Sequence, residues 1–366
     1  MKLFRSFLPL LLVLLILLVS CGVDPPGNTN NTETSDILRD PAEVTLTDTA
    51  ADRSVDRYTV SLPENTNVGE VAYCDGSIYF TTLLTGSGKQ YDPSVALYRY
   101  DPESDKVEEL YSFDEDQCVS ELFVIGDDIF FEVNVPGPVK IVRYNTVSEK
   151  IDTIAEYQSG GDPILYSCGQ YLLWYEHQSS LKIFAYDTIK GTTEVIAGGL
   201  SAYNAYSRPY VSDGILAYVT EEADCRVIHV YDVAEHKEIT SKKVDRSILV
   251  ARPQANREYI VFTGGYERSS PVYVYSMRSD RFMVLKDNRL LGAGFVRLAG
   301  SFVLLRSESG KKMIAVGMEH DSFSEVEVLA TGDEMSIGYF DVSSDGTVFT
   351  CISGINSLVT ISPADW

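Results

Sequence analysis

Positive charge and histidine are scarce in this chain. Its 30 Lys and Arg residues stand against 53 Asp and Glu, which gives a formal net charge of −23 at pH 7. Binding to nucleic acid depends on cationic side chains that displace counterions from phosphates, and no basic stripe is present. The 4 His residues follow no spacing typical of a zinc site. We therefore expect no nucleic acid partner and no bound metal.

Cysteine is sparse as well, and its spacing is irregular. The chain has 6 Cys and no C-x-x-C pair: Cys21, Cys74, Cys118, Cys168, Cys225 and Cys351. Without Cys21 the number is odd, so a disulfide framework is not expected. Several of these positions lie in predicted strands where a small apolar residue would also fit, which indicates buried free thiols. A single disulfide bridge stays open as the alternative.

The N-terminal segment has no apolar run long enough to cross a membrane comfortably. An uncharged run of 13 residues extends from Phe7 to Val19, after Lys2 and Arg5, whereas a membrane-spanning helix needs about 20 apolar residues. Small residues at the end of the run suit a signal peptidase. Residues 1–20 are therefore predicted to be a signal peptide. An uncleaved anchor helix is the alternative.

The run ends in LVSCG at residues 18–22, which resembles the lipobox of bacterial lipoprotein signals. The resemblance implies cleavage before Cys21, a diacylglyceryl thioether on its sulfur, and a lipid anchor on the extracytoplasmic side of the cell membrane or envelope. Acyl chains contribute about 0.8 kcal/mol per buried methylene, so two chains attach a protein durably. A plain secretory signal is the alternative. Cleavage would take the net charge from −23 to −25, because Lys2 and Arg5 are removed.

Residues 21–55 have the composition of a tether. They are rich in Pro, Asn, Thr and Asp and poor in large apolar residues, which is typical of flexible linkers. The end nearest Val44 could be partly ordered against the folded part. We predict a lipidated cysteine with a flexible tether at 21–55 and one folded domain at 56–366.

The folded part is built from repeats. The stretch from Ala96 to Phe113, ALYRYDPESDKVEELYSF, places two apolar runs around a polar turn, the pattern of an antiparallel hairpin. Its tyrosine recurs at steps of 44, 42, 45 and 44, as Tyr100, Tyr144, Tyr186, Tyr231 and Tyr275. An apolar residue after the first turn recurs at steps of 51, 43, 44, 44, 43 and 45, as Ile78, Ile129, Leu172, Leu216, Ile260, Val303 and Val348. Repeats of this length made only of strands are typical of a β-propeller, so seven units predict seven blades.

Each unit is predicted to form a blade of four antiparallel strands. In the first unit they are Val68 to Tyr73, Ser77 to Thr82, Val95 to Tyr100 and Lys106 to Phe113. The first step is long because a loop from Leu83 to Ser94 is inserted between two strands. Adjacent residues such as Tyr79 and Phe80 are both apolar, which indicates strands covered on both faces.

The seventh unit lacks a fourth strand. It has Ile337 to Val342, Thr347 to Ile352 and Ser357 to Ile361, and the sequence ends at Trp366. Arg57 to Leu62 precedes the first unit and has no other place in the scheme. We predict that this segment pairs with Ser357 to Ile361 and closes the ring, which removes exposed sheet edges.

The units resemble those of TolB-like and YncE-like bacterial propellers, in which a strand ending in Tyr-Asp precedes a polar turn. Tyr100-Asp101 shows this pattern, and Asp345-Gly346 after Ser343-Ser344 is similar to the S-P-D-G turn of TolB-like repeats. The proline is absent here, and the units number seven rather than six. The resemblance covers 56–366 and implies a propeller, but propellers serve as enzymes, receptors and scaffolds, so it implies no function.

Many propellers bind ligands at one mouth of the central channel, on the face made by the loops from second to third strands and from blade to blade. Carboxylates and tyrosines dominate that face, and tyrosine rings suit sugars or peptide side chains. The candidate ligand-face residues are Tyr91, Asp92, Asp114, Glu115, Asp116, Glu176, His177, Tyr203, Tyr206, Glu222, Arg268, Arg289, Asp333 and Glu334. A solvated rim is the alternative for this acidic protein.

No catalytic or cofactor motif stands out. His177 beside Glu176 is the best candidate for a general base. Asp101, Glu103 and Asp105 have the spacing of a calcium loop without the rest of its pattern, so turn chemistry is the preferred interpretation. Gly86-Ser87-Gly88-Lys89 lacks the spacing of a phosphate loop. We expect no cofactor.

The sequence therefore predicts a monomeric binding or scaffolding module that recognises a protein, peptide or saccharide, rather than an enzyme. The alternative is an envelope glycoside hydrolase or lyase that uses paired carboxylates at the channel mouth.

Overall fold

The computed structural model describes residues 37–44, 46–48, 55–88, 92–134, 138–157, 164–177, 181–200, 208–265, 270–285, 296–306, 310–319, 322–330, 335–343, 346–353 and 356–362. The predicted signal peptide and lipobox lie outside these ranges. No helix within them is long and apolar enough to cross a membrane.

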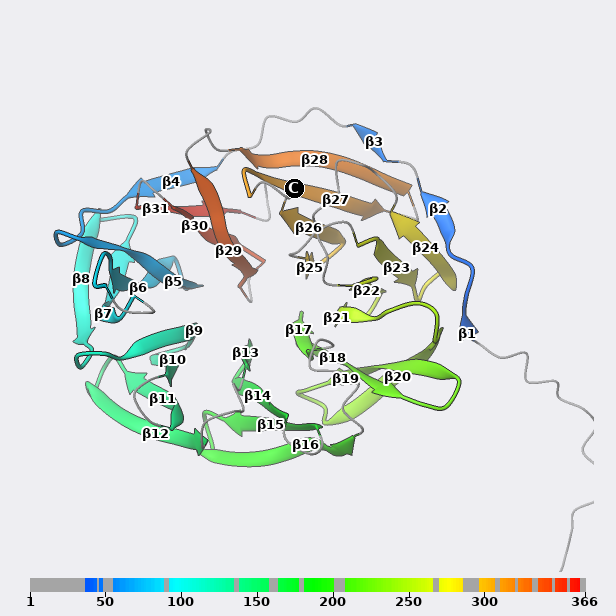
Figure 1. Ribbon diagram of the computed structural model, residues 1–366, viewed down its shortest axis with the longest axis horizontal. Coiled ribbons are helices and arrows are strands. Elements are labelled where there is room, and N and C mark those ends of the chain that lie inside the picture. The colour runs from blue at the N-terminus through cyan, green and yellow to red at the C-terminus, as the bar shows by residue number, and fades with distance from the viewer. Residues whose placement is uncertain are drawn as a thin grey trace, which may run out of the picture. The chain divides into compact units, whose positions relative to one another are not determined.

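The described chain forms seven sheets arranged in a ring, each built on four antiparallel strands (Figure 1). Blade 1 consists of β5 (Thr66–Cys74), β6 (Ser77–Leu84), β7 (Ser94–Asp101) and β8 (Lys106–Ser112). Blade 2 consists of β9 (Cys118–Ile125), β10 (Asp128–Asn134), β11 (Val139–Asn145) and β12 (Lys150–Tyr157). Blade 3 consists of β13 (Ile164–Cys168), β14 (Tyr171–His177), β15 (Leu181–Asp187) and β16 (Thr192–Leu200).

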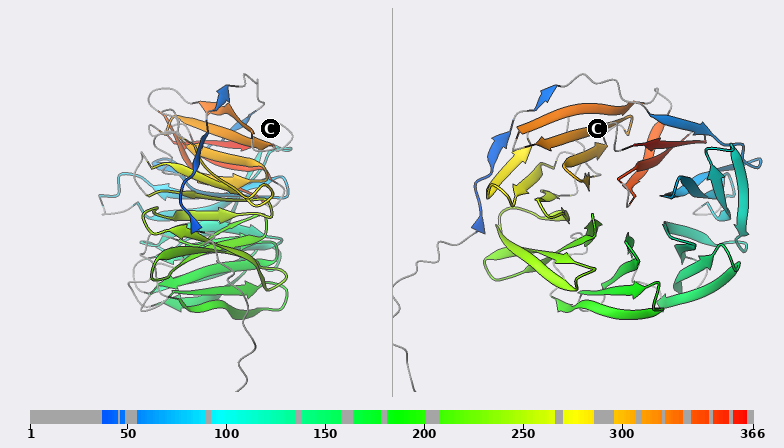
Figure 2. Two further views of the ribbon diagram at one scale, coloured as in Figure 1. Left: turned by 90° about the vertical axis from the view of Figure 1, so that its right-hand side faces the viewer. Right: turned by 180° about the vertical axis from the view of Figure 1, so that it is seen from behind.

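Blades 4 to 7 follow the same order. They consist of β17 (Tyr210–Ser212), β18 (Ile215–Glu221), β19 (Cys225–Asp232) and β20 (Lys237–Asp245); β21 (Ala251–Ala255), β22 (Tyr259–Thr263), β23 (Val272–Ser276) and β24 (Arg281–Leu285); β25 (Val296–Ala299), β26 (Phe302–Arg306), β27 (Lys312–Glu319) and β28 (Ser322–Ala330); and β29 (Ser336–Val342), β30 (Val348–Ser353) and β31 (Ser357–Ile361) with β4 (Asp56–Thr59). In each blade the first strand lies nearest the ring centre (Figures 1 and 2). The predicted seven-bladed propeller is confirmed.

The strand β4 closes the ring, as the sequence predicts. It pairs antiparallel with β31, with Thr59 opposite Ser357 and Asp56 opposite Thr360. The strand is shorter than the predicted Arg57 to Leu62, but Val60 just beyond it is only 5% exposed and packs with Ile78 and other residues of blade 1. The segment therefore joins the last blade to the first by hydrogen bonds on one side and apolar packing on the other.

The segment 37–48, which we call the strap, adds a feature that the repeat pattern does not contain. Its short strands β1 (Ile37–Leu38), β2 (Ala42–Val44) and β3 (Thr47–Asp48) pair in parallel with β20, β24 and β28, the outermost strands of blades 4, 5 and 6. Figure 1 shows the strap in blue along the outside of these blades. Part of the segment 21–55, for which the sequence predicts a flexible tether, thus pairs with the blades.

The strap is attached by side chains as well as by backbone pairing. Leu38 and Val44 pack against the buried clusters of the blades, and Leu46 is only 6% exposed within such a cluster. The Arg39 guanidinium lies 3.2 Å from the Asp245 carboxylate. Edge strands offer unpaired backbone groups to other chains, and the strap covers two or three residues of this edge in each of the three blades.

The core lies between neighbouring blades. Phe130 and Phe131, adjacent in β10, both have no exposed surface, because Phe130 packs toward blade 3 and Phe131 toward blade 1. Tyr79 and Phe80 in β6 are buried in the same way. The prediction that these strands are covered on both faces is confirmed.

The repeated turn between third and fourth strands is a local structural device. The Asp101 carboxylate accepts the backbone N–H of Glu103 at 3.0 Å and the hydroxyl of Ser104 at 2.6 Å, while the Tyr100 hydroxyl donates to Asp105 at 2.9 Å. Asp105 has a positive φ of 52°, and the equivalent turns place Glu149, His236 and Asp280 in the same conformation. This turn chemistry agrees with the interpretation preferred over a calcium loop.

The five cysteines of the propeller are free thiols. Cys168 and Cys225 are buried, and Cys74, Cys118 and Cys351 are half-buried. The prediction that no disulfide joins these five is confirmed, whereas the predicted burial holds for Cys168 and Cys225 alone among them.

Candidate ligand-binding site in the central channel

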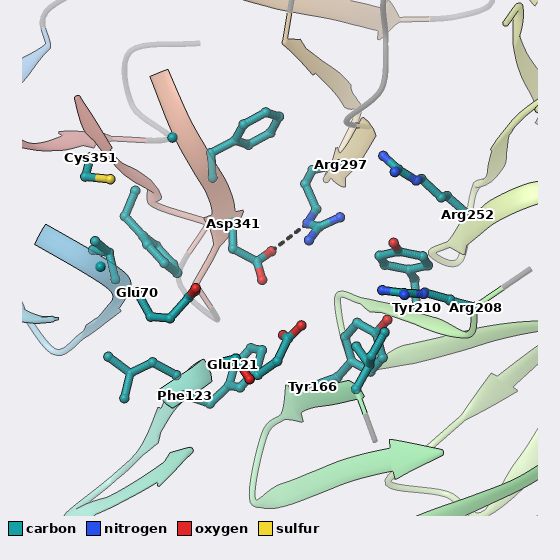
Figure 3. Close-up of a pocket in the computed structure, with 18 residues that line it drawn as sticks. Glu70, Glu121, Phe123, Tyr166, Arg208, Tyr210, Arg252, Arg297, Asp341 and Cys351 are labelled. Atoms are coloured by element: carbon teal, nitrogen blue, oxygen red, sulfur yellow. Dashed lines mark hydrogen bonds and ion pairs between the residues drawn. The ribbon is translucent and has the colours of Figure 1, made fainter. Parts of the chain in front are cut away.

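A cavity of about 430 Å³ lies in the central channel, on the half nearer the predicted ligand face. All seven blades line it through or next to their first strands, and most of its charged and aromatic side chains are labelled in Figure 3: Glu70, Glu121, Phe123, Tyr166, Arg208, Tyr210, Arg252, Arg297 and Asp341. A second cavity of about 290 Å³ lies toward the turns between first and second strands, and Arg297 and Asp341 line both.

Bulges in the first strands bring some of these side chains into the channel. In β5 the pair Gly69 and Glu70 stands opposite the single residue Thr81, and β9, β21 and β29 have equivalent irregularities. A bulge inserts one extra residue and changes the direction of a side chain. At two of these bulges Glu121 and Arg252 have positive φ values of 58° and 51°.

The bulge in β5 depends on a glycine because two chains come close together there. A Cβ at Gly69 would lie 2.6 Å from the Thr81 hydroxyl oxygen, which is closer than van der Waals contact permits. The same hydroxyl accepts the backbone N–H of Glu70 at 3.0 Å. Gly69 and Thr81 together therefore set the position from which Glu70 enters the channel.

The charges in the cavity are sorted by side. The carboxyl groups of Asp341, Glu70 and Glu121 come from blades 7, 1 and 2, and the three arginines from the segments that open blades 4, 5 and 6: Arg208, Arg252 and Arg297. Figure 3 shows the two Glu carboxyl groups facing the guanidinium groups across the channel. Tyr166 of blade 3 stands between the two sides. The cavity can therefore orient a ligand that has one anionic end.

Arg297 is held firmly between two partners. Its Nε lies 3.0 Å from Asp341 Oδ1, and its guanidinium carbon lies 5.1 Å from the centre of the Tyr210 ring. Burial acts to lower the pKa of Arg297, but Asp341 and the nearby tyrosines outweigh burial and raise it overall. The charge of Arg297 is thus already balanced by a carboxylate.

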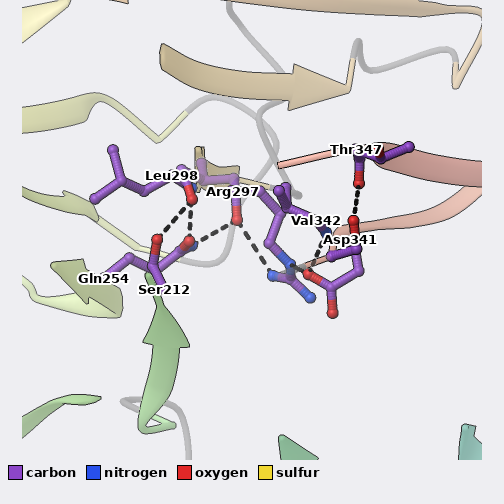
Figure 4. Close-up of polar contacts among 9 residues, drawn as sticks. Ser212, Gln254, Arg297, Leu298, Asp341, Val342 and Thr347 are labelled. Atoms are coloured by element: carbon purple, nitrogen blue, oxygen red, sulfur yellow. Dashed lines mark hydrogen bonds and ion pairs between the residues drawn. The ribbon is translucent and has the colours of Figure 1, made fainter. Parts of the chain in front are cut away.

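The strand that carries Arg297 is fixed by a buried hydrogen-bond network (Figure 4). Gln254 donates to the Val296 carbonyl at 2.6 Å and accepts the Leu298 N–H at 2.7 Å. The Ser212 hydroxyl donates to the Leu298 carbonyl at 2.7 Å. Three neighbouring blades are joined by these bonds, so the arginine side of the cavity is preorganised.

Glu70 and Glu121 have carboxyl pKa values raised into the neutral to slightly alkaline range. Burial raises the pKa of Glu70 from 4.5 to about 7. Burial, followed by the charges of Glu70 and Glu132, raises the pKa of Glu121 from 4.5 to about 8. Within the described part of the chain, neither carboxyl group has a hydrogen-bonding or ion-pair partner. At pH values below about 7, both groups can therefore donate as well as accept hydrogen bonds.

Tyr166 offers a further unsatisfied group. Its side chain is only 7% exposed, and its hydroxyl has no hydrogen-bond partner among the described residues. Burial, followed by the neighbouring Tyr210, raises the pKa of Tyr166 well above its usual value, so the hydroxyl stays protonated. A buried hydroxyl without a partner is costly, and a ligand in the cavity would satisfy it.

The described candidates from the sequence lie away from this cavity. They are Asp92, Asp114, Glu115, Asp116, Glu176 and Glu222, and none of them lines it. The side chain of His177 and the residues Tyr91, Tyr203, Tyr206, Arg268, Arg289, Asp333 and Glu334 lie outside the described part of the chain.

Three of these candidates have local roles. Asp92 lines a small pocket of about 140 Å³ together with Asn67 and Asn356. The Asp114 carboxylate accepts a hydrogen bond from Gln117 at 3.3 Å. Glu222 forms an ion pair with Lys243 at 3.1 Å.

The channel residues are not among the predicted candidates, because those candidates lie on loops whereas the cavity is lined mainly from the first strands. The signal is nevertheless present in the aligned units. The reference is the apolar residue that recurs after the first turn of each unit, Ile78 in the first unit. The residues eight positions before it include Glu70, Glu121, Arg208 and Arg252, and those six positions before it include Tyr166, Tyr210 and Arg297. A charged residue recurring inside an otherwise apolar strand would have identified the channel.

Comparisons with known proteins support the fold alone. No family model and no curated protein matches the chain. Among solved structures, a streptogramin B lyase aligns with a TM-score of 0.55 and 13% identity over 84% of this chain and 97% of that chain. The propeller domain of the Trilobed protease from Pyrococcus furiosus aligns with a TM-score of 0.55 and 12% identity over 83% of this chain and 95% of that chain.

The predicted resemblance to TolB is distant in structure. TolB from Acinetobacter baumannii aligns with a TM-score of 0.44 and 12% identity over 70% of this chain and 64% of that chain.

Proposed function

We propose that this chain is a membrane-anchored, extracytoplasmic binding propeller that holds a small polar ligand in the channel cavity. The observation that carries the proposal is the charge-sorted lining, with arginines on one side and nearly neutral carboxyl groups on the other. Its volume of about 430 Å³ lies within the range of about 300–1,000 Å³ that is common for ligand sites.

A ligand screen by saturation-transfer NMR tests the site. The full-length chain, purified in detergent, is mixed in turn with sugars, sugar acids, amino acids, organic acids and short peptides. We expect at least one compound whose signal is lost in the variant Arg208→Ala. Arg278→Ala is the matched control, because Arg278 lies exposed in the outer turn between β23 and β24. Binding that is indifferent to Arg208 would contradict a channel site.

The anchor part of the proposal rests on the lipobox at residues 18–22. In a bacterial host, we expect the chain to incorporate labelled fatty acid and to sediment with membranes. Cys21→Ser should abolish both, whereas Cys74→Ser should change neither. A Cys21→Ser chain that still incorporates the label would refute the lipoprotein assignment.

A hydrolase or lyase is the second candidate, because two carboxyl groups with raised pKa values converge on a cavity with aromatic walls. Glu121, with a pKa of about 8, is the candidate acid, and Glu70 the candidate base. Incubation of the screened saccharides with the protein separates the two functions. Recovery of unchanged compound supports binding alone, and conversion that disappears in Glu121→Gln supports the enzyme.

A further inference from the structure

We propose that the ligand of the channel cavity is a sugar acid, a saccharide ring that carries a carboxylate, with the carboxylate on the arginine side. This inference rests on the proposed function and specifies the chemistry of its ligand.

The arginine side indicates an anionic group. Arg297 is already paired with Asp341 at 3.0 Å. Arg208 has no ion-pair partner among the described residues, and Arg252 also lines the cavity, with the Tyr210 ring drawn between the two arginines in Figure 3. Guanidinium groups present planar forks that match carboxylate oxygens, so this side suits a carboxylate.

The opposite side indicates hydroxyl groups rather than a second charge. The carboxyl groups of Glu70 and Glu121 line the cavity and have no hydrogen-bonding or ion-pair partner within the described residues. The Tyr166 hydroxyl likewise has none, and each of the three groups can both donate and accept when it is protonated. Neighbouring hydroxyls on a ring satisfy several such groups at once. Phe123, Phe340 and Phe349 add apolar surface to the lining, which suits the C–H face of a sugar.

A ligand with an ammonium group fits this cavity less well. Arg297 is close enough to Glu121 to lower the pKa of that carboxyl group, against the larger effects of burial and the other carboxylates. Burial acts to lower the pKa of Arg208, but the nearby tyrosines, and after them Glu121, outweigh burial and raise it overall. An ammonium group beside Glu121 would thus lie near two guanidinium groups. Amino acids and peptides are therefore disfavoured relative to a sugar acid.

Isothermal titration calorimetry of the full-length chain in detergent tests the inference. The probes are galacturonic acid, glucuronic acid, N-acetylneuraminic acid and trigalacturonic acid. The controls are galactose, the methyl ester of galacturonic acid, phenylalanine and inorganic phosphate. We expect at least one acid to bind, and removal of its charge, or Arg208→Ala, to weaken binding by about tenfold or more. Arg278→Ala should leave the affinity unchanged.

Tyr166→Phe provides a second variant that does not endanger the fold. It removes only a hydroxyl that has no partner in the described structure, so thermal stability should be kept while affinity falls by about threefold to tenfold.

The inference is overturned if no acid binds at millimolar concentration, if the methyl ester binds as well as the acid, or if phenylalanine or phosphate binds more tightly. In those cases a compound from the wider screen that depends on Arg208 would leave the proposed binding function standing. If no ligand depends on Arg208, both the sugar-acid inference and the proposed binding function are wrong.

Discussion

Replacing Glu121 with glutamine should stabilise the propeller at alkaline pH and leave it nearly unchanged at acidic pH. Burial is the main cause that raises the pKa of Glu121 from 4.5 to about 8, with Glu70, Glu132 and Asp341 acting in the same direction and Arg297 against it. A carboxyl group with a raised pKa holds its proton more tightly in the folded state. Its contribution to stability is fully present below pH 4.5 and is lost as the pH rises through about 8.

The size of the effect follows from the shift. One pKa unit corresponds to about 1.4 kcal/mol, so a shift from 4.5 to about 8 sets an upper limit of about 5 kcal/mol. The cavity is open to water, which screens the ionised carboxylate, and Arg208 faces it across the channel. We therefore expect Glu121→Gln to gain about 2 kcal/mol at about pH 9 and less than about 0.5 kcal/mol at about pH 5.

Urea unfolding followed by tryptophan fluorescence at the two pH values measures both free energies. Glu103→Gln is the matched control, because Glu103 lies exposed in the outer turn of blade 1. The comparison uses the difference between variants, so other titrating groups cancel. A loss of stability in Glu121→Gln at the alkaline pH would refute the reasoning, since it would mean that the ionised carboxylate is held favourably by the arginines.

Three further substitutions test the packing that positions the cavity. Val60→Ala, at the ring closure, should lower the free energy of unfolding by about 2 kcal/mol in urea titrations, whereas Val147→Ala, 75% exposed, should change it by less than about 0.5 kcal/mol. Leu46→Ala should lower the free energy of unfolding by about 3 kcal/mol if the strap is part of the cooperative fold. An unchanged urea midpoint would show that the strap does not contribute to the stability of the propeller. In Gly69→Ala the new Cβ would lie 2.6 Å from the Thr81 hydroxyl oxygen. The substitution should lower the free energy of unfolding by about 1–3 kcal/mol and weaken ligand binding measured by calorimetry. Unchanged stability together with unchanged binding would contradict the role given to the bulge.

The blades could be predicted from the sequence because their geometry repeats. Tyr100 and its copies mark one hairpin in each unit, and the same backbone conformation recurs at Asp105, Glu149, His236 and Asp280. Ring closure could also be predicted, since the last unit lacks one strand and the segment before the first unit has no other place in the four-strand scheme. These features depend on local turn chemistry and on the number of strands, both of which are present in one sequence.

The strap could not be predicted in the same way. Its strands contain two or three residues each, too few for an alternating pattern, and they pair in parallel with strands about 200 to 280 positions away in the chain. Leu38, Val44 and Leu46 are scattered among Pro, Asp and Thr residues that are typical of linkers. Only the outer surface of blades 4 to 6 gives these three side chains a place to be buried.

The channel residues show why position matters more than composition. The first strand of a propeller blade has a neighbour on one edge only, so its other edge faces the channel and tolerates polar side chains. Small residues on the channel side of these first strands would be enough if their side chains had only to let the ring close. Instead the chain places Glu121 and Arg252 at positive φ values of 58° and 51° and keeps two glutamates at a desolvation cost visible in their pKa values of about 7 and about 8. Strain and desolvation of this kind reduce stability, and they cluster where binding or catalysis requires them. The two coincide at Glu121, and each occurs alone at Glu70 or Arg252, all three on bulged first strands. The inner channel is therefore a better candidate for the functional site than the acidic rim.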